Sequence, residues 1–565
     1  MKQQNEQNSQ KPPRIEIYRK NAVDMPMRYI ARFTLEAEST IRIGAGGQRG
    51  LEDNPVVLDV NGFPYIPGTS IAGVIRHALE EETGDDIVQI LGSPSDNLKD
   101  KDDDEDDDEA RGLGSRMQFS SAYLLATDGK YVHQGLDLDK PDSIDLEHEY
   151  YQEVKSVRDN VAITHKGTAK QHAKYQTRLV LKGTRFVCEI ELVGSKKDRP
   201  VWSNALGYIQ HQTFRVGAGT RNGFGRLKVL KCESVQYDLS DERQMRAYLD
   251  KSSSLNSSLA GAKAYQASDL EDALMEAWEE INIRLKAADF FLFGAGEEEA
   301  RPKKENFFQW GGAVPRLREA YLIPATSIKG ALAHRTAFHY NKIQSFYIEE
   351  SGMTVEQDPL DLESAISEMF PTNLSRIAEM TYDPRAKEWD ELEAKIKAIE
   401  LENSTAWQSL EKVLKSVEIV PKGVGEQNQA VNALFGSAKK DFPDEEKKKA
   451  EQGDEKRDEG HRGKILFEDA YLEEVEEKIL NHVAIDRFTG GGIDGALFSA
   501  SVASTKAATE FKIFVQKSAF KADKNIEKAL RAAIKDLEEG RLQLGGQTTK
   551  GHGVFQATKK IAVSA

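Results

Sequence analysis

The segment IPGTSIAG at residues 66–73 decides the fold, because it recurs as IPATSIKG at residues 323–330. In each copy a proline-containing extended stretch leads into a sequence with helical apolar spacing. Thr69 or Ser70 can cap the first of these helices, and the apolar residues that follow form its buried side. The two copies therefore predict two domains, each built around the same strand-to-helix transition.

Further motifs on both sides of this segment repeat in the same order. A shared order of this kind indicates a tandem duplication with insertions, not a short-period solenoid. The matching pairs are RFTLEAESTIRIGAG (32–46) with IRLKAADFFLFGAG (283–296), ILGS (90–93) with LFGS (434–437), MQFSSAYL (117–124) with ILFEDAYL (465–472), VAI (161–163) with VAI (483–485), and GAGTRNGFG (217–225) with GGQTTKGHG (545–553).

The duplication divides the chain into segments. The stretch between the copies is rich in Ser, Ala and Gly, which is typical of a linker. The second copy is much longer between IPATSIKG and LFGS, and apolar residues there have helical spacing. We expect a polar N-terminal arm (1–26), a first domain (27–240) with a disordered acidic insert (95–112), a linker (241–277), and a second domain (278–565) with a helical insertion (about 331–430) and a charged insert (about 438–463).

Composition excludes several classes of protein. The chain has 565 residues, of which 39% are hydrophobic and 30% charged, so it can form packed cores. Its two cysteines exclude a disulfide framework and a four-cysteine zinc site. The sequence contains no apolar run long enough to span a membrane, so no membrane partner is expected. The polar N-terminus lacks the pattern of a signal peptide. We therefore expect a cytoplasmic protein.

The net charge of −16 does not exclude a nucleic-acid partner. The segment DKDDDEDDDE (100–109) contains nine acids and one lysine. Half of the net negative charge therefore lies in one loop, which we expect to be solvated. In contrast, VRDNVAITHKGTAKQHAKYQTRLV (157–180) has no acid after Asp159. This stretch predicts either a hairpin that binds a polyanion or simply a solvated hairpin. Its candidate RNA-binding residues are Arg158, Lys166, Lys170 and Lys174.

Glycine-rich loops provide further candidate phosphate contacts. In VGAGTRNGFGRLKV (216–229) glycines alternate with arginines, and LGGQTTKGHGVF (544–555) is its counterpart. Glycine lets the backbone approach a ligand, arginine suits phosphate oxygens, and a helix N-terminus attracts anions. An ordinary capped helix and a bulged hairpin would give the same pattern. The candidates are Gly44, Gly46, Ser70, Arg76, Arg221, Arg226, Ser327, Lys329, Arg487 and Lys550.

Together these motifs resemble the RAMP (repeat-associated mysterious protein) superfamily of CRISPR systems. More narrowly, the chain resembles a fused tandem pair of backbone subunits of type III effector complexes. The resemblance rests on IRIGAG, PYIPGTSIAG, VRDNVAITHKGTAK and GAGTRNGFGRLKV in the first copy and on their counterparts in the second. It implies an α+β fold of two modified RNA-recognition-motif (ferredoxin-like) domains. It also implies thumb hairpins, the first with residues from Val154 to Lys174, and a guide RNA along a filament of subunits.

The resemblance also implies a catalytic aspartate, Asp53 in LEDNPVVLD, which would hold a divalent cation, expected to be Mg²⁺, and promote cleavage of target RNA. Asp59 is the competing candidate, and no organic cofactor is expected. A kinked RNA can align its own 2′-hydroxyl for attack, and a nearby carboxylate can hold a cation. If Pro315 matches Pro55, Ala313 takes the position of Asp53. The second domain is then expected to bind RNA but to cleave it poorly or not at all.

Three functions remain open on the sequence. The first is a guide-RNA-binding backbone subunit that cleaves complementary target RNA. The second is a non-catalytic scaffold for guide and target. The third is a guide-processing endonuclease with a histidine base, which is disfavoured because no histidine pair repeats in register between the copies. The expected partners are guide RNA, target RNA and other CRISPR effector subunits.

Overall fold

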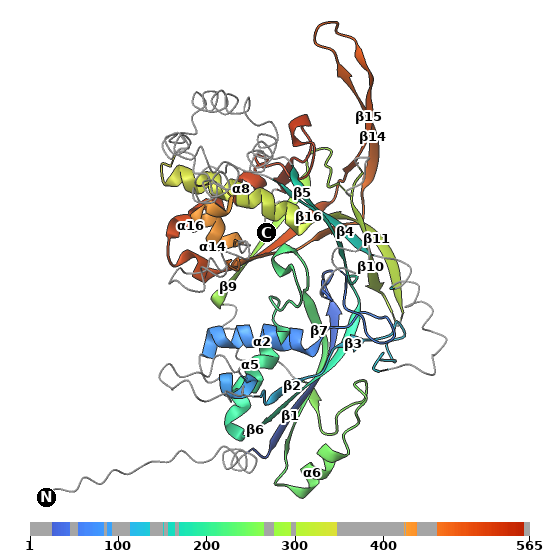
Figure 1. The fold of residues 1–565 in the computed structure, drawn as a ribbon, viewed down its shortest axis with the longest axis vertical. Coiled ribbons are helices and arrows are strands. Elements are labelled where there is room, and N and C mark those ends of the chain that lie inside the picture. Colours follow the sequence, from blue (N-terminus) through green and yellow to red (C-terminus); the bar gives the residue numbers. More distant parts are fainter. Residues whose placement is uncertain are drawn as a thin grey trace, which may run out of the picture.

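The computed structural model describes residues 25–45, 55–83, 87–92, 114–135, 151, 156–163, 169–264, 276–294, 301–312, 314–346, 423, 425–437 and 460–558. Two mixed α+β domains with antiparallel sheets follow one another along the longest axis of the molecule (Figure 1). The acidic insert, most of the predicted helical and charged inserts, and the N-terminal arm up to residue 24 lie outside the described residues.

The first domain is a sheet with β1 (Met27–Ala37) at its centre. Strand β1 pairs with β6 (Arg185–Gly194) on one side and β7 (Leu227–Asp238) on the other. The short strands β2 (Met117–Phe119) and β3 (Tyr123–Leu124) extend the sheet beyond β6, and β8 (Lys263–Ala264) extends it beyond β7. Alternate β1 side chains such as Phe33 pack under α2 (Gly68–Thr83), α3 (Val88–Leu91) and α5 (Arg199–Gln210), which cover one face (Figure 1).

The second domain repeats this arrangement. Strand β9 (Trp278–Ala287) lies between β16 (Ala508–Gln516) and β17 (Phe555–Ala557), and β12 (Ile465–Phe467) pairs with β16. The helices α8 (Ala325–Ile343), α14 (Gln429–Phe435) and α16 (Lys524–Glu538) pack against this sheet. The strand order β12-β16-β9-β17 matches β2-β6-β1-β7 of the first domain, as expected for a duplicated domain.

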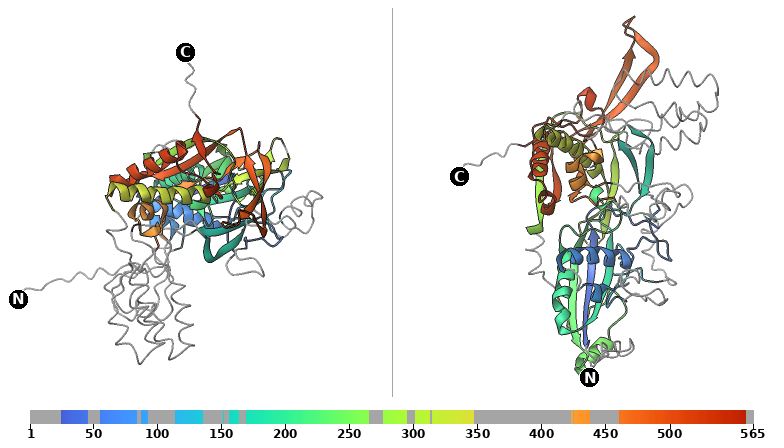
Figure 2. Two further views of the ribbon diagram at one scale, coloured as in Figure 1. Left: turned by 90° about the horizontal axis from the view of Figure 1, so that it is seen from above. Right: turned by 60° about the vertical axis from the view of Figure 1, so that its left-hand side comes forward.

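Each domain also carries a two-stranded hairpin, formed by β4 (Val157–Ile163) with β5 (Ala169–Arg178) and by β14 (Glu476–Ile485) with β15 (Gly492–Ser504). Both hairpins have a register shift at the VAI motif, between Val161 and Ile163 and between Val483 and Ile485. The repeated VAI therefore marks a shared irregularity of the strand. The second hairpin projects far from the rest of the molecule (Figures 1 and 2).

The second domain has an additional hairpin, β10 (Lys304–Trp310) with β11 (Pro315–Ile323), and β13 (Ala470–Leu472) pairs with β11. The first domain has only a tight turn at the corresponding place, where Leu58 bridges Pro64 as Lys304 pairs with Tyr321. Among the helices that the structure describes, none is long and apolar enough to cross a membrane.

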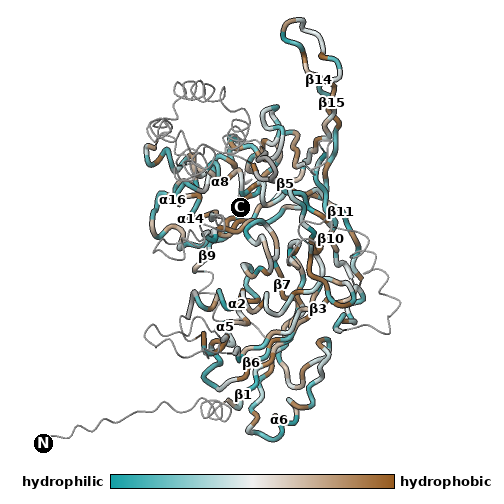
Figure 3. Tube along the Cα trace, in the orientation of Figure 1, coloured by the Kyte–Doolittle hydropathy of each residue, from teal (hydrophilic) through white to brown (hydrophobic). Residues whose placement is uncertain are grey.

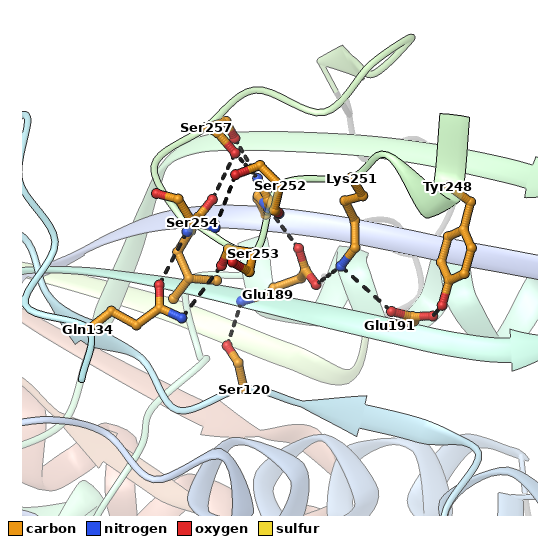
Figure 4. Close-up of polar contacts among 12 residues, drawn as sticks. Ser120, Gln134, Glu189, Glu191, Tyr248, Lys251, Ser252, Ser253, Ser254 and Ser257 are labelled. Carbon is orange, nitrogen blue, oxygen red and sulfur yellow. Dashed lines mark hydrogen bonds and ion pairs between the residues drawn. The ribbon is translucent and has the colours of Figure 1, made fainter. Parts of the chain in front are cut away.

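The predicted linker is largely part of the first domain. Asp241 caps α6 (Glu242–Leu249), and the chain that follows lies on the sheet face opposite α2. The buried Arg32 side chain donates to Glu189 and to the backbone carbonyl groups of Ser252 and Ser257. Lys251 and Tyr248 anchor the same segment to Glu189 and Glu191 (Figure 4). The composition predicted a linker, but the backbone carbonyl groups of two of its serines accept hydrogen bonds from a buried arginine.

Candidate nucleic-acid interface

The glycine-rich loops follow the same backbone path in both domains. Gly217 and its counterpart Gly545 have φ values of 91° and 90°. A Cβ atom at Gly217 would lie 2.2 Å from the carbonyl oxygen of Arg42, and one at Gly545 would lie 2.4 Å from that of Leu292. Glycine is therefore required at these positions by packing within each domain. Part of the glycine signal in the sequence comes from folding and not from a ligand.

The start of the first repeated helix remains accessible, while one predicted RNA contact near it has another role. Ser70 and its counterpart Ser327 are partly exposed, and Gly44 is exposed. Arg76 instead donates to the carbonyl groups of Gly92, at 2.9 Å, and of Leu91. These contacts tie α2 to the end of α3, so Arg76 is held in a structural position.

Arg158, predicted as an RNA contact, is buried between the domains. Its side chain is 1% exposed, donates to both carboxylate oxygens of Glu305 at 2.8 Å, and lies 2.9 Å from Asp469. Burial opposes its charge, but Asp469 and Glu305 outweigh that effect and raise its pKa. In this structure Arg158 is thus held by carboxylates of the other domain, and no local sequence pattern reveals these partners.

Arg226 also binds the second domain. It lies 2.8 Å from Glu38 of its own domain and pairs with Glu468 across the domain boundary. Lys329 makes the reverse contact, donating to the side-chain oxygen of Asn222 in the first glycine-rich loop at 3.0 Å. The predicted contacts Arg226 and Lys329 therefore meet at the surface between the two domains, which we call the joint.

A cavity of about 280 Å³ opens at the joint, where α2 and α5 approach the start of β9. Sequence reasoning identified Arg221 in its wall but missed the rest. Among the described residues that line it none is acidic. Cationic side chains beside aromatic rings can bind phosphates and stack against a base. Its basic and aromatic lining residues are His77, Tyr208, Arg215, Arg221, Trp278, Arg462 and Lys521.

Arg215 is the buried cation in this wall. It is 3% exposed, and its Nη2 atom lies 3.0 Å from Glu468, but its Nε atom has no hydrogen-bond partner. Burial lowers its pKa to about 10, although Glu468 opposes that shift. A buried donor without a partner is costly, so a ligand oxygen at this wall would satisfy it. Arg221 already donates to the carbonyl group of Gly463 at 2.9 Å.

Both hairpins expose a row of apolar side chains on their first strands. Val157, Val161 and Ile163 are 41%, 47% and 59% exposed. The corresponding Ile479, Val483 and Ile485 are 68%, 52% and 61% exposed. Hydrophobic segments accordingly continue into the projecting hairpin (Figure 3). Apolar rows that face solvent mark an interaction surface.

The second strands of the hairpins differ in charge. Lys174 on β5 is exposed and lies 3.8 Å from Asp159. By strand register, Leu497 on β15 takes its place, since Val161 pairs with Lys174 and Val483 pairs with Leu497. The first hairpin is therefore the more basic of the two. The side chains of Lys166 and Lys170 lie outside the described residues.

Two predicted contacts of the second domain are near its hairpin. Arg487 is exposed at the hairpin tip beside Phe488, which is 99% exposed. The Lys550 ammonium lies 4.7 Å from the centroid of the Phe498 ring, which links the second glycine-rich loop to β15. Both cations remain on the surface, in contrast to Arg158 and Arg226.

Of the two candidate catalytic aspartates, only Asp59 is described, because Asp53 lies outside the described residues. The candidate RNA contact Gly46 lies outside them as well. One Asp59 carboxylate oxygen accepts hydrogen bonds from the backbone N–H groups of Asn61 and Phe63, both at 2.9 Å. Asp59 is therefore the turn-forming residue of the loop. Within the described ranges, no three or more His, Cys, Asp or Glu side chains gather where they could hold a metal ion.

Backbone pairing corrects the alignment between the loop that contains Asp53 and its counterpart in the second domain. The N–H group of Val57 bonds to Ile43, as that of Lys303 bonds to Phe293. The bridge Gly44–Val56 likewise matches Gly294–Pro302. Pro302 therefore corresponds to Val56, the residue directly after Pro55, and Pro315 does not correspond to Pro55.

This correction changes which residue corresponds to Asp53. Glu299 precedes Pro302 by the same number of residues as Asp53 precedes Val56. The second loop is four residues shorter between its bridge residues than the first, so counting back from Pro302 gives an acid, and not Ala313, on the C-terminal side of the loop. The additional β10–β11 hairpin displaced the sequence alignment. Glu299 itself is outside the described residues.

The duplicated α+β fold, the basic cavity at the joint and the exposed hairpins define a protein of the RNA-binding class. The sequence matches the RAMP superfamily over residues 34–228 and again over residues 312–556, so the chain belongs to this superfamily as a tandem pair of its domains. Membership indicates a CRISPR-associated RNA-binding protein that assembles with other subunits. No curated protein matches the chain.

Proposed function

We propose that this chain is a guide-RNA-binding backbone subunit of a type III CRISPR ribonucleoprotein. The observation that carries the proposal is the cation-lined cavity at the joint between two RAMP domains. It brings Arg221 of the first glycine-rich loop together with His77 on α2 and Lys521 of the second domain. An RNA strand that follows the tandem domains would cross this joint, with its phosphates near the cations and a base near Trp278.

The exposed hairpins support the same proposal. Their apolar rows offer a surface against which unstacked bases can lie, and the lysines of the first hairpin offer phosphate contacts. Two equivalent hairpins on successive domains would contact an RNA at regular intervals. This regularity suits a guide held along a filament better than a single processing site.

We further propose that the bound target RNA is cleaved beside Asp53. The RNA supplies the nucleophile, because a kinked strand can place its 2′-hydroxyl in line with the scissile phosphorus. A divalent cation, when bound, supplies positive charge beside that phosphate. The Asp53 carboxylate would orient the site, and Glu299 gives the second domain a corresponding acid. The corrected alignment removes the reason to expect an inactive second domain.

The test is cleavage of a labelled, guide-complementary RNA by the assembled complex with Mg²⁺. Asp53→Ala is expected to abolish one cut, and Glu299→Ala a second cut, while the guide remains bound in both preparations. Glu298→Ala serves as the matched control for Glu299. Asp59→Asn should leave both cuts in place.

A non-catalytic scaffold is the competing function. Cuts that persist in the Asp53→Ala and Glu299→Ala variants would assign cleavage to another subunit and leave this chain as a scaffold. Failure of the purified wild-type chain to retain guide RNA would overturn the proposal of guide binding itself.

A further inference from the structure

The joint shows which surface of the second domain receives its neighbour. Phe514 is fully buried there beneath the guanidinium groups of Arg215 and Arg226, which lie 5.3 and 5.9 Å from its ring centre. On the adjacent strand, Glu280 accepts a hydrogen bond from Gln212 at 2.9 Å. The residues on either side of Phe514 point into the core under α8 and α16, so Phe514 lies on the opposite sheet face. We call this sheet face the docking face.

Strand register identifies the docking face of the first domain. Glu280 pairs with Phe514 as Ile30 pairs with Glu191. Each of these four residues lies 11 positions along its strand from a bridge that is equivalent in the two domains. Ile30 and Glu191 therefore occupy the places of Glu280 and Phe514. The two bridges are Ile41–Val180 and Phe291–Ala503.

In the first domain, a segment of the same chain already covers this face. Residues 239–264, which include α6, lie at the end of the molecule away from the second domain (Figure 1). Ile30 is fully buried in one apolar cluster with Leu259 of this segment. Glu191 accepts a hydrogen bond from the Tyr248 hydroxyl group at 2.7 Å (Figure 4). We call residues 239–264 the cap.

The cap also satisfies charged groups of the face. The buried Arg32 donates to the carbonyl groups of Ser252 and Ser257, both at 2.6 Å. Lys251 forms an ion pair with Glu189, which in turn binds Arg32 (Figure 4). Without the cap, two guanidinium nitrogen atoms of a buried arginine would lose these acceptors, which is costly. The cap is therefore held by polar contacts as well as by apolar packing.

The docking faces of the two domains differ at matching positions. Arg32 pairs with Glu189 as Asn282 pairs with Lys512, so the second domain has no ion pair at this place. The apolar Ile30 likewise takes the place of an exposed acid. These differences fit each face to its own cover. The first face suits the cap, and the second suits a neighbouring domain.

The cap reaches both borders of the sheet. At one border, β8 of the cap pairs with β7. Toward the other border, Leu255 packs against Leu125 and Val187, beside β3. Asn256 there donates to the carbonyl group of Lys130. A neighbouring domain could bind this face only by displacing the cap along its length.

We infer that the cap permanently occupies the docking face of the first domain, so that a row of stacked domains containing this chain begins at its first domain. A domain that replaced the cap would have to supply acceptors for Arg32 and an apolar cover for Ile30. The outward side of the first domain in the joint offers Arg215 and Arg226 at this level instead, and both are cations. The inference concerns the order of domains and does not depend on which RNA the chain binds.

Hydrogen–deuterium exchange of the full-length chain, free and in the assembled ribonucleoprotein, tests whether the cap stays in place. Peptides from the cap should exchange at rates that agree within about twofold in the two states. Exchange about tenfold faster on assembly would show that the cap leaves the face, and exchange about tenfold slower would show that another subunit covers it. Either result overturns the inference.

A variant pair tests whether these contacts hold the cap. Lys251→Met combined with Leu259→Ala should speed exchange of cap peptides about tenfold, while peptides from α2 on the other sheet face keep their rate. Ser254→Ala combined with Ser258→Ala, at two exposed serines of the cap, is the matched control. Unchanged exchange in the first double variant would refute the assignment of these contacts and with it the inference.

A bulky label tests whether another domain binds over the cap. Ser258 is exposed, so Ser258→Cys can be modified with a maleimide-linked polyethylene glycol. The native Cys188 and Cys232 are buried, and the wild-type chain treated with the same reagent is the control. The labelled chain is expected to enter the ribonucleoprotein as efficiently as the unlabelled variant. A label that blocks assembly would show that a subunit occupies this end, which would overturn the inference.

Discussion

Two arginines that the sequence indicated as RNA contacts instead bind groups of the protein. Arg158 lies in a basic stretch, yet its guanidinium is enclosed by two carboxylates from another domain. Arg76 donates hydrogen bonds to carbonyl groups at the end of α3. A sequence gives the identity of a cation but not its partners, which for Arg158 lie in the other domain. The surface cations Arg487 and Lys550 have few such partners and so remain available.

His211 gives a prediction at the residue scale. It is 4% exposed, its Nδ1 atom lies 2.7 Å from the Thr213 hydroxyl, and burial lowers its pKa to about 4. The unfolded state, with a histidine pKa near 6.5, binds more protons between these values. The stabilisation by neutral His211 is therefore complete above pH 6.5 and is lost as the pH falls toward 4, by up to about 3 kcal/mol.

Chemical denaturation at pH 7 and at pH 4.5 checks this prediction. His211→Asn retains an acceptor for the Thr213 N–H group but cannot titrate in this range. The variant should lose less stability than the wild-type chain between the two pH values. His77→Asn, at an exposed histidine, is the matched control. Equal losses in the His211→Asn variant and the wild-type chain would refute the assignment.

At the scale of elements, periodicity and internal repetition predicted most of the fold. The repeated strand-to-helix motif, the central strands and both hairpins lie where the matching motifs placed them. The sequence did not predict the correct alignment between the Asp53 loop and its counterpart, because the β10–β11 hairpin is inserted between two motifs and shifts the alignment of the residues before it. Part of the predicted linker packs on the first domain, and serine-rich composition does not indicate the backbone carbonyl groups that accept hydrogen bonds from Arg32.

The two hairpins carry the prediction at this scale. Lys170→Gln combined with Lys174→Gln should weaken binding of single-stranded RNA and make its salt dependence shallower. Each lost phosphate contact lowers the slope of log affinity against log salt by about 0.7. Lys524→Gln combined with Lys528→Gln, on the exposed side of α16, is the matched control. The measurement is a fluorescence titration at several salt concentrations. An unchanged slope in the first double variant would show that this hairpin makes no phosphate contact.

At the scale of the whole molecule, the joint couples two domains that each have their own hydrophobic core. Within the described part of the chain, the contact between them combines charge pairs with close backbone packing. Trp310 donates to the carbonyl group of Gly183 at 2.7 Å, and the Arg185 guanidinium stacks 3.6 Å from the centre of its ring. Coupling of this kind holds the cavity walls, which come from both domains, in one arrangement.

Arg158→Ala tests how far this coupling determines stability and binding together. Removing one partner leaves Glu305 and Asp469 buried without a counter-charge, a loss of about 3–5 kcal/mol. Calorimetry should then show the two domains unfolding in separate transitions, and RNA affinity should fall although Arg158 contacts no solvent. Arg246→Ala removes an exposed pair with Glu242 and should cost about 1 kcal/mol or less. If Arg158→Ala lowered RNA affinity while unfolding stayed unchanged, Arg158 would be a direct RNA contact, and the joint would open when RNA binds.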